Sequence, residues 1–168
     1  MERIARFSLV TEKRWIKDWE LGTEAEGLRL YGALKLPSRA TAGSAGYDFY
    51  TPVDISLKPG ESIKVPTGLR AEMSDGWVLL IVPRSSLGFK YKLELNNTVG
   101  VIDSDYYYSD NEGHIFIKIT NGNTEGKTVE IRAGQAFAQG VFVPFGITVD
   151  DECSAVRNGG IGSTDQKK

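Results

Sequence analysis

Apolar residues near the start of the chain recur with the period of a helix. Trp15, Ile16 and Trp19 fall on one face of a helix that would run from Thr11 to Glu20. A threonine hydroxyl can accept a hydrogen bond from the first turn of such a helix, so Thr11 is placed to cap it. We therefore expect a short surface helix over 11–20 whose tryptophans dock on the core or on a neighbouring subunit.

From residue 28 onward the pattern changes to that of strands. Leucines alternate with other residues over 28–36, and helical periodicity is nearly absent after residue 27. Turn signals such as Pro59-Gly60 and Asp75-Gly76 separate further apolar runs. The strands expected from these runs are Ser62–Val65, Leu69–Met73, Trp77–Val82, Ile115–Ile119, Thr128–Ile131 and Gly140–Val143. Short strands at this spacing predict an all-β protein, either a sandwich or a jelly roll.

The composition is that of one folded domain. A chain of 168 residues can bury one ordinary core, and 40% hydrophobic with 25% charged residues excludes a disordered tail protein. The longest apolar run, Trp77–Val82, is far shorter than the ~18 residues of a membrane span, so no membrane partner is expected. A net charge of −2 gives no indication of a nucleic acid polymer as partner.

The residues that most often bind zinc are nearly absent. The chain has one histidine, His114, and one cysteine, Cys153, too few for the ligands of a zinc site. A lone cysteine cannot form an internal disulfide, which fits a reducing cytoplasm. No Ser or Cys motif is directed at His114, so we interpret it as a structural histidine.

The chain divides into three segments. We expect an N-terminal extension with a short helix over 1–27, a β jelly-roll domain over 28–152 and a C-terminal arm over 153–168. Gly159, Gly160 and Gly162 make the arm costly to order by itself. It is either a disordered tail or a lid that becomes ordered over a ligand.

One segment is similar to a phosphate-binding P-loop. Residues 122–128 have three residues between their glycines where the P-loop has four. They lead into the alternating run Val129-Glu130-Ile131 and not into a helix whose N-terminus would face phosphate. We therefore exclude a P-loop and interpret Asn121-Gly122 as a hairpin turn.

Asp103 is the most informative acidic residue. It follows the apolar pair Val101-Ile102, which places it at the end of a short predicted strand beside a glycine-containing hairpin. A carboxylate held there can accept a proton from water. Taken alone, the segment fits an aspartate in a solvated turn better.

Five segments in order change that interpretation. They are Ala45–Asp48, Pro83–Gly88, Asn97–Tyr106, Gly134–Gln139 and Arg157–Thr164. Together they closely resemble the five motifs of the homotrimeric dUTPases, over residues 36–165. The resemblance implies a distorted jelly roll, hydrolysis of dUTP to dUMP and pyrophosphate with Mg²⁺, and a homotrimer with shared active sites. Such an activity keeps uracil out of DNA and supplies dUMP for dTMP synthesis.

The resemblance also implies how the reaction proceeds. Asp103 matches the aspartate that orients the water attacking the α-phosphorus. Tyr106 matches the aromatic residue that packs under the deoxyribose and leaves no room for a 2′-hydroxyl. Asn97 matches the amide that reads the uracil edge, since an amide carries both donors and acceptors. Backbone groups in a hairpin too tight for a 5-methyl group would assist it, namely those of Gly100, Val101 and Ile102.

The same resemblance assigns residues to the phosphates and the metal. Arg84, with Ser85 and Ser86, matches the phosphate-binding motif, because a guanidinium fork suits phosphate oxygens. Mg²⁺ is expected to arrive with the nucleotide, held by phosphate oxygens and by waters bonded to Asp48 and Gln139.

The C-terminal arm is implied to close over substrate bound at a neighbouring subunit. Arg157 matches the arginine at the start of the family's arm motif, where its guanidinium fork would bind phosphate oxygens. Ile161, Gly162 and Ser163 would also contact the nucleotide. Ile161 stands where many family members have an aromatic ring over the uracil, so stacking is lost while apolar cover remains. The loop over 107–112 is longer than is usual in the family, and we interpret its tyrosines as surface packing.

Two alternatives remain. A dCTP deaminase shares the fold, but its glutamate base matches Lys118 here, which cannot act as a carboxylate. A non-catalytic jelly-roll protein, structural or regulatory, would have no need of the site residues named above.

Overall fold

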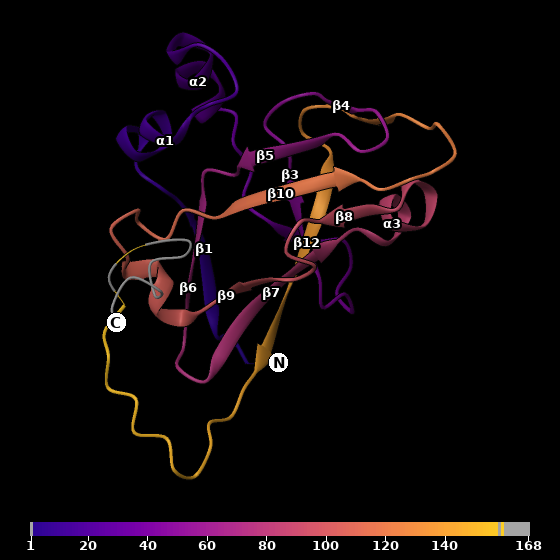
Figure 1. Cartoon of the computed structure of the whole chain (residues 1–168). Helices are drawn as coiled ribbons and strands as arrows, with labels where there is room; N and C mark the ends of the chain where they lie inside the picture. Colours follow the sequence, from indigo (N-terminus) through magenta and orange to yellow (C-terminus); the bar gives the residue numbers. More distant parts are fainter. Residues whose placement is uncertain (1, 158, 160–168) are drawn as a thin grey trace.

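Antiparallel strands are the main regular structure of the protein and surround its main apolar core (Figure 1). The computed structural model describes residues 2–157 and 159, and within these the strands form four sheets. The largest runs in the order β2 (Ser38–Arg39), β3 (Tyr47–Tyr50), β12 (Ala136–Pro144), β7 (Trp77–Pro83) and β9 (Gly100–Ile102). The others join β5 (Ser62–Pro66), β10 (Phe116–Asn121) and β8 (Leu93–Leu95), then β1 (Ala5–Leu9) with β6 (Leu69–Met73), and β11 (Val129–Ile131) with β4 (Ile55–Leu57). The expected all-β class is confirmed.

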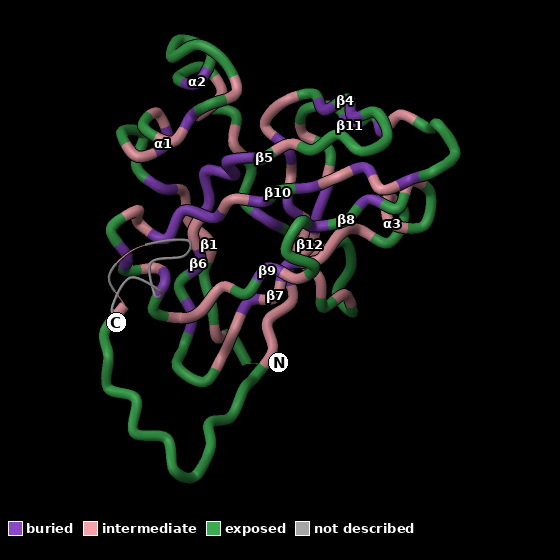
Figure 2. The backbone as a smooth tube through the Cα atoms, in the orientation of Figure 1, coloured by how far each residue is buried: buried purple, intermediate pink, exposed green. Residues whose placement is uncertain are grey.

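Alternation along the strands explains the core. Successive side chains of a strand point to opposite faces, so β10 buries Ile117 and Ile119 while Lys118 is exposed. On β7 the same alternation buries Leu79 and Ile81. Figure 2 shows buried stretches on β5, β10 and β8 and, across from them, on β7 and β12. The core therefore lies between the three-stranded and five-stranded sheets.

The first expected helix is confirmed. Helix α1 covers Glu12–Asp18, and the Thr11 hydroxyl accepts a hydrogen bond from the backbone N–H of Arg14 at 3.1 Å. This is the capping interaction that the sequence predicts, because a threonine oxygen satisfies a free N–H of the first turn.

The strand expected over 28–36 is wrong. Residues Glu24–Tyr31 form helix α2, which begins with a capping box between Thr23 and Glu26. Leu30 and Tyr31 pack at the edge of the small core around Trp15 from the end of this helix, and Leu34 joins them from the chain that follows it. The capping box satisfies backbone donors at the start of the segment and favours the helix.

Both tryptophans of α1 are buried within the same chain. Trp15 and Trp19 pack with Val10 in a small second core that includes Leu30 and Leu34 at its edge. The Trp15 indole N–H donates to the carbonyl of Gly27 at 2.7 Å, so its one polar atom is satisfied. The expected docking on a core is confirmed, and it uses α2 as the partner.

Other differences concern short elements. The six expected strands overlap β5, β6, β7, β10, β11 and β12, and the short strand expected before Asp103 is β9, whereas β1, β2, β3, β4 and β8, of two to five residues each, were not predicted. Helix α3 (Ser85–Tyr91) and the 3₁₀ helix η1 (Ser104–Tyr108) show that the expected lack of helix after residue 27 is also wrong. No helix of the described ranges is long and apolar enough to cross a bilayer.

Asn121-Gly122 is not a hairpin turn. Strands β10 and β11 belong to different sheets, and the chain passes between them over 122–128. The buried Asn121 side chain holds this crossover by donating to the carbonyls of Leu57 at 2.8 Å and Lys127 at 2.9 Å. Strand β11 follows at Val129, so the exclusion of a P-loop is confirmed.

Candidate active site

Asp103 directly follows β9, as the sequence predicts. Strand β9 pairs with β7 in an antiparallel register that sets Gly100 opposite Ile81 and Ile102 opposite Leu79. Asp103 then occupies the position before the first residue of η1, with its side chain about half exposed at 48%. The backbone hydrogen bonds between β7 and β9 thus fix the position of the residue that carries this carboxylate.

Arg157 lies against Asp103. Its guanidinium forms an ion pair with Asp103 and a second one with Asp105, whose carboxylate oxygen is 2.8 Å from Nε. The guanidinium carbon is 5.7 Å from the centre of the Tyr106 ring. Asp103, Tyr106 and Arg157, all identified from the sequence, are therefore brought together, and Asp105 is a member that the sequence analysis missed.

Tyr106 is held firmly below this cluster. It is 7% exposed, and its hydroxyl donates to the carbonyl of His114 at 2.7 Å and accepts from the Asn111 amide at 2.7 Å. Burial raises the pKa of the phenol, an effect that the Asn111 hydrogen bond and the charge of Arg157 offset only in part. The phenol therefore stays protonated at neutral pH, and its two hydrogen bonds fix the orientation of the ring.

A second group of site residues surrounds Arg84. Asp48 on β3 lies opposite Gln139 on β12, and Nε of Arg84, at the end of β7, is 3.2 Å from an Asp48 carboxylate oxygen. A side chain at Gly46 would collide with the Gln139 amide oxygen, whose distance to a Cβ there would be 2.7 Å. A hollow of about 380 Å³ opens here and is lined in part by Asp48, Arg84 and Ser86.

Ser85 and Ser86 start helix α3, for which Arg84 is the preceding residue. The backbone N–H groups of Leu87 and Gly88 bond to the Arg84 carbonyl, which turns the chain sharply away from β7. Arg84 and Ser86 of the Arg-Ser-Ser segment thus line the hollow.

The two groups lie at opposite ends of β7. Asp103 follows Ile102, which pairs with Leu79, so it lies beside Val78, whereas Arg84 follows the last residue of β7. Six residues of extended strand span roughly 20 Å. One chain therefore does not bring Asp103 and Arg84 to the same phosphate group.

The remaining site residues are placed as follows. Asn97 lies in the turn between β8 and β9, where its carbonyl accepts from the N–H of Val99 at 2.6 Å. Ile161, Gly162 and Ser163 lie outside the described residues. Among the residues that are described, no group of three or more His, Cys, Asp or Glu side chains could hold a metal ion.

The long loop after Tyr106 packs on the protein surface. The guanidinium carbon of Arg70 lies 3.5 Å from the centre of the Tyr107 ring, while Tyr108 is exposed. The loop closes with two left-handed residues, Glu112 (φ 61°) and Gly113 (φ 69°). The sequence Asn111-Glu112-Gly113 is typical of such a turn. It was the only local signal that Asn111 would be held close to Tyr106.

His114 is structural, as expected. It is fully buried, Nε2 accepts from the N–H of Gly68 at 2.9 Å, and Nδ1 lies 2.7 Å from an Asp18 carboxylate oxygen. Burial lowers the pKa of the imidazole more than the Asp18 interaction raises it, so the ring is neutral at pH 7.

Comparison with known proteins decides the family. A family model described as dUTPase matches residues 33–165. The chain belongs to the dUTPase family. The deoxyuridine 5′-triphosphate nucleotidohydrolase of Lactococcus lactis is 46% identical over 134 residues, covering 78% of this chain and 88% of that protein. The enzyme of the same name from Hahella chejuensis is 38% identical over 147 residues, covering 83% and 92%.

Solved structures agree with this assignment. The dUTPase from Streptococcus mutans is 37% identical and superimposes with a TM-score of 0.62, covering 84% of this chain and 97% of that one. The dUTPase of phage phi11 of S. aureus shares the fold at 20% identity, with a TM-score of 0.63. The jelly-roll expectation and the resemblance to dUTPases are both confirmed.

Proposed function

We propose that the protein hydrolyses dUTP to dUMP and pyrophosphate. The observation that carries this proposal is the half-exposed Asp103 carboxylate at the end of β9, beside the buried Tyr106 ring and the Arg157 guanidinium. The curated relatives carry the matching name, and the exposed free Cys153 is in keeping with the cytoplasm.

Asp103 acts on the water. Its carboxylate accepts a hydrogen bond from a water aligned with the α-phosphorus and takes the proton as the new O–P bond forms. The bond from the α-phosphorus to the bridging oxygen breaks, and pyrophosphate leaves. A triphosphate competes with Asp103 and Asp105 for Arg157, so the guanidinium is available to stabilise charge on the phosphates.

Selectivity depends on the β9 segment. The Tyr106 ring, fixed by its hydroxyl, packs under deoxyribose and excludes a 2′-hydroxyl. Asn97 and the backbone of Gly100, Val101 and Ile102 read uracil and leave no space for the thymine methyl group.

The phosphate chain is bound at the Arg84 end of β7, where Ser85 and Ser86 add donors. Asp48 and Gln139 lie opposite each other in the strand register. Their side-chain oxygens are ligands that suit Mg²⁺ and can accept hydrogen bonds from its bound waters. When bound, Mg²⁺ would neutralise part of the negative charge on the phosphates. The phage phi11 dUTPase is described with a structural Mg(II) ion, which supports the metal for this chain.

The site requires more than one chain. Asp103 and Arg84 lie at opposite ends of β7 in one subunit, so a triphosphate that touches both must lie between two subunits. We infer a homotrimer with shared sites, in which the jelly-roll domain over 28–152 carries Asp103 and Arg84 and the arm over 153–168 closes on a neighbour. Arg157, which pairs with Asp103 of its own chain in the single subunit, would then exchange that partner for the substrate bound at the neighbouring site.

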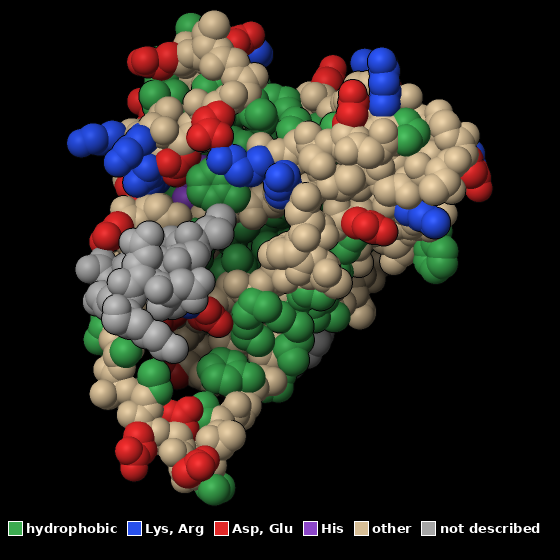
Figure 3. Space-filling view, in the orientation of Figure 1, with side chains coloured by type: hydrophobic (Ala, Val, Ile, Leu, Met, Phe, Trp, Pro, Cys, Tyr) green, Lys and Arg blue, Asp and Glu red, His purple; other side chains and the backbone are tan. Residues whose placement is uncertain are grey.

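The segment after β12 supports this assembly. Over residues 145–156 the chain leaves the body of the protein as a long exposed excursion (Figures 1 and 2). Phe145, Ile147 and Val149 are all at least half exposed and alternate as in a strand. Asp150, Asp151 and Glu152 follow them, and acidic side chains gather on this part of the surface (Figure 3).

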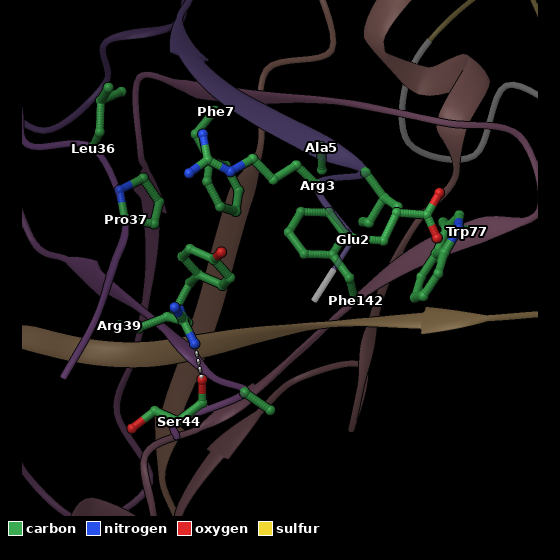
Figure 4. Close-up of a pocket in the computed structure, with 13 residues that line it drawn as sticks. Glu2, Arg3, Ala5, Phe7, Leu36, Pro37, Arg39, Ser44, Trp77 and Phe142 are labelled. Carbon is green, nitrogen blue, oxygen red and sulfur yellow. Dashed lines mark hydrogen bonds between the residues drawn. The ribbon is translucent and has the colours of Figure 1, made fainter. Parts of the chain in front are cut away.

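A groove near the N-terminus complements this segment, because its lining combines aromatic side chains with arginines. It measures about 840 Å³ and opens between β1 and β2, with Phe7 and Phe142 in its wall and Arg3 and Arg39 beside them (Figure 4). In the described part of the chain, β1 pairs only with β6 and β2 only with β3, so each has a free edge. We infer that residues 145–152 of a second copy occupy this groove as an added strand, with the acidic residues near the arginines.

A charge on that segment tests the assembly. Ile147→Asp should shift the protein from trimer to monomer in light scattering, because it would bury a carboxylate in an aromatic groove. Leu28→Asp, on the exposed face of α2, is the matched control and should remain a trimer. Trimers that persist in Ile147→Asp would refute this occupant of the groove.

Substrate selectivity tests the activity directly. Pyrophosphate release with Mg²⁺ is expected from dUTP, with dTTP and UTP hydrolysed far more slowly, and chelation of the metal should suppress it. Equal rates on the three nucleotides would contradict the selectivity assigned to Tyr106 and the β9 segment. Ammonia release from dCTP would favour the deaminase alternative, which the exposed Lys118, opposite Lys64 on β5, does not support.

A further inference from the structure

Helix α1, which together with α2 precedes the residues of the family match, contacts the segment that follows Asp103. The helical hairpin, residues 11–34, contains α1 and α2, and the dUTPase model matches from residue 33. In Figure 1, α1 lies next to the loop that leads into β10. Polar contacts join the hairpin to this loop at two points.

The first contact is at the start of α1. The Glu112 carboxylate accepts hydrogen bonds from the Thr11 backbone N–H at 2.8 Å and from the Thr11 hydroxyl at 2.7 Å. Burial raises the pKa of Glu112, but these bonds and the charges of Arg70 and Arg14 outweigh it, so the net pKa is lowered. The N-cap of α1 is therefore tied to the turn that closes the loop.

The second contact is at the end of α1. One oxygen of Asp18 pairs with Arg14 at 2.6 Å, and the other lies 2.7 Å from Nδ1 of the buried His114. Because Nε2 of His114 accepts from the N–H of Gly68, the ring proton is on Nδ1 and is donated to Asp18. Asp18 thus fixes both the tautomer and the orientation of this ring.

His114 in turn holds Tyr106. Its carbonyl accepts from the Tyr106 hydroxyl, and its N–H donates at 3.1 Å to the carbonyl of Asn111, whose amide donates to the same hydroxyl. The Tyr106 N–H bonds at 3.2 Å to the carbonyl of Asp103. A continuous set of hydrogen bonds therefore leads from Asp18 to the turn that carries the candidate base.

We propose that Asp18 is a positioning residue for the active site, which orients Tyr106 through His114 and so couples the helical hairpin to selectivity for deoxyribose. This inference rests on the proposed function. The hydrophobic cluster around Trp15 stabilises the hairpin, but the ionic and polar contacts of α1 are directed at the loop behind Tyr106. Small displacements of a positioned group can cost about 10²-fold in rate.

The test compares Asp18 variants with a control from the same hairpin. Asp18→Ala should lower kcat/KM for dUTP about 10- to 100-fold and the dUTP-to-UTP ratio of kcat/KM about tenfold. Asp18→Asn keeps an oxygen that can accept from His114 and should recover most of the ratio. Glu20→Gln removes the exposed Glu20–Lys64 pair and should match the parent in both measurements.

Each outcome decides the proposal. If the parent hydrolyses dUTP and Asp18→Ala keeps its selectivity, the positioning role is refuted while the proposed function stands. Equal losses on dUTP and UTP would assign Asp18 to stability alone and also refute it. If Asp18→Ala does not fold, Glu112→Gln, which weakens the other contact, must lower the selectivity ratio for the proposal to survive. A parent that does not hydrolyse dUTP would instead refute the proposed function.

Discussion

Asp103→Asn should lower kcat for dUTP by about 10²- to 10⁴-fold, the usual contribution of a positioned general base. The asparagine has the same size but cannot take up the proton of the attacking water at neutral pH. The Arg157–Asp105 pair at 2.8 Å and the β7–β9 ladder do not involve the Asp103 carboxylate, so the local structure should persist. The measurement is the initial rate of pyrophosphate release at saturating dUTP.

The matched control is Asp75→Asn, which makes the same chemical change in the exposed turn between β6 and β7. It should retain the parental kcat. Nucleotide affinity, measured with a non-hydrolysable dUTP analogue, should change little in Asp103→Asn. A variant that hydrolyses dUTP at the parental rate would show that another group activates the water.

Locally determined features were predictable from the sequence. The Thr11 cap and the position of Asp103 after an apolar pair depend on a few neighbouring residues, and both are found. Helix α2 shows the limit, because leucines at alternate positions indicated a strand where Leu28 is exposed and Leu30 packs on the small core from a helix. The Thr23–Glu26 capping box was the deciding signal, and it acts on backbone donors that a pattern of apolar residues does not reveal.

Contacts distant in sequence were not predictable. Asn121 links β10 to β4 across 64 residues, and the sequence alone suggested a hairpin there. The motif residues were identified individually, but their division between the two ends of β7 follows from the strand register, which no single motif specifies. The dependence of Tyr106 on Asn111 and His114 likewise arises from the folded loop.

Because Arg84 and Asp103 lie at opposite ends of β7, two inactive variants should restore each other's activity when their chains assemble together. Arg84→Ala and Asp103→Asn should each be nearly inactive as pure proteins, because every site loses one essential group. Refolded together in equal amounts, they should regain about a quarter of the parental activity. Three quarters of randomly assembled trimers are mixed, and each mixed trimer has about one site in three with an intact Arg84 from one chain and an intact Asp103 from its neighbour.

The control combines Asp103→Asn with a second protein carrying both substitutions. These mixtures contain no intact Asp103 and should remain inactive, which shows that recovery comes from chain combination and not from refolding itself. If the Arg84→Ala and Asp103→Asn mixture forms mixed trimers by mass spectrometry but stays inactive, each site is built within one chain. The roughly 20 Å between the two groups along β7 would then have to be closed by a rearrangement of the subunit itself.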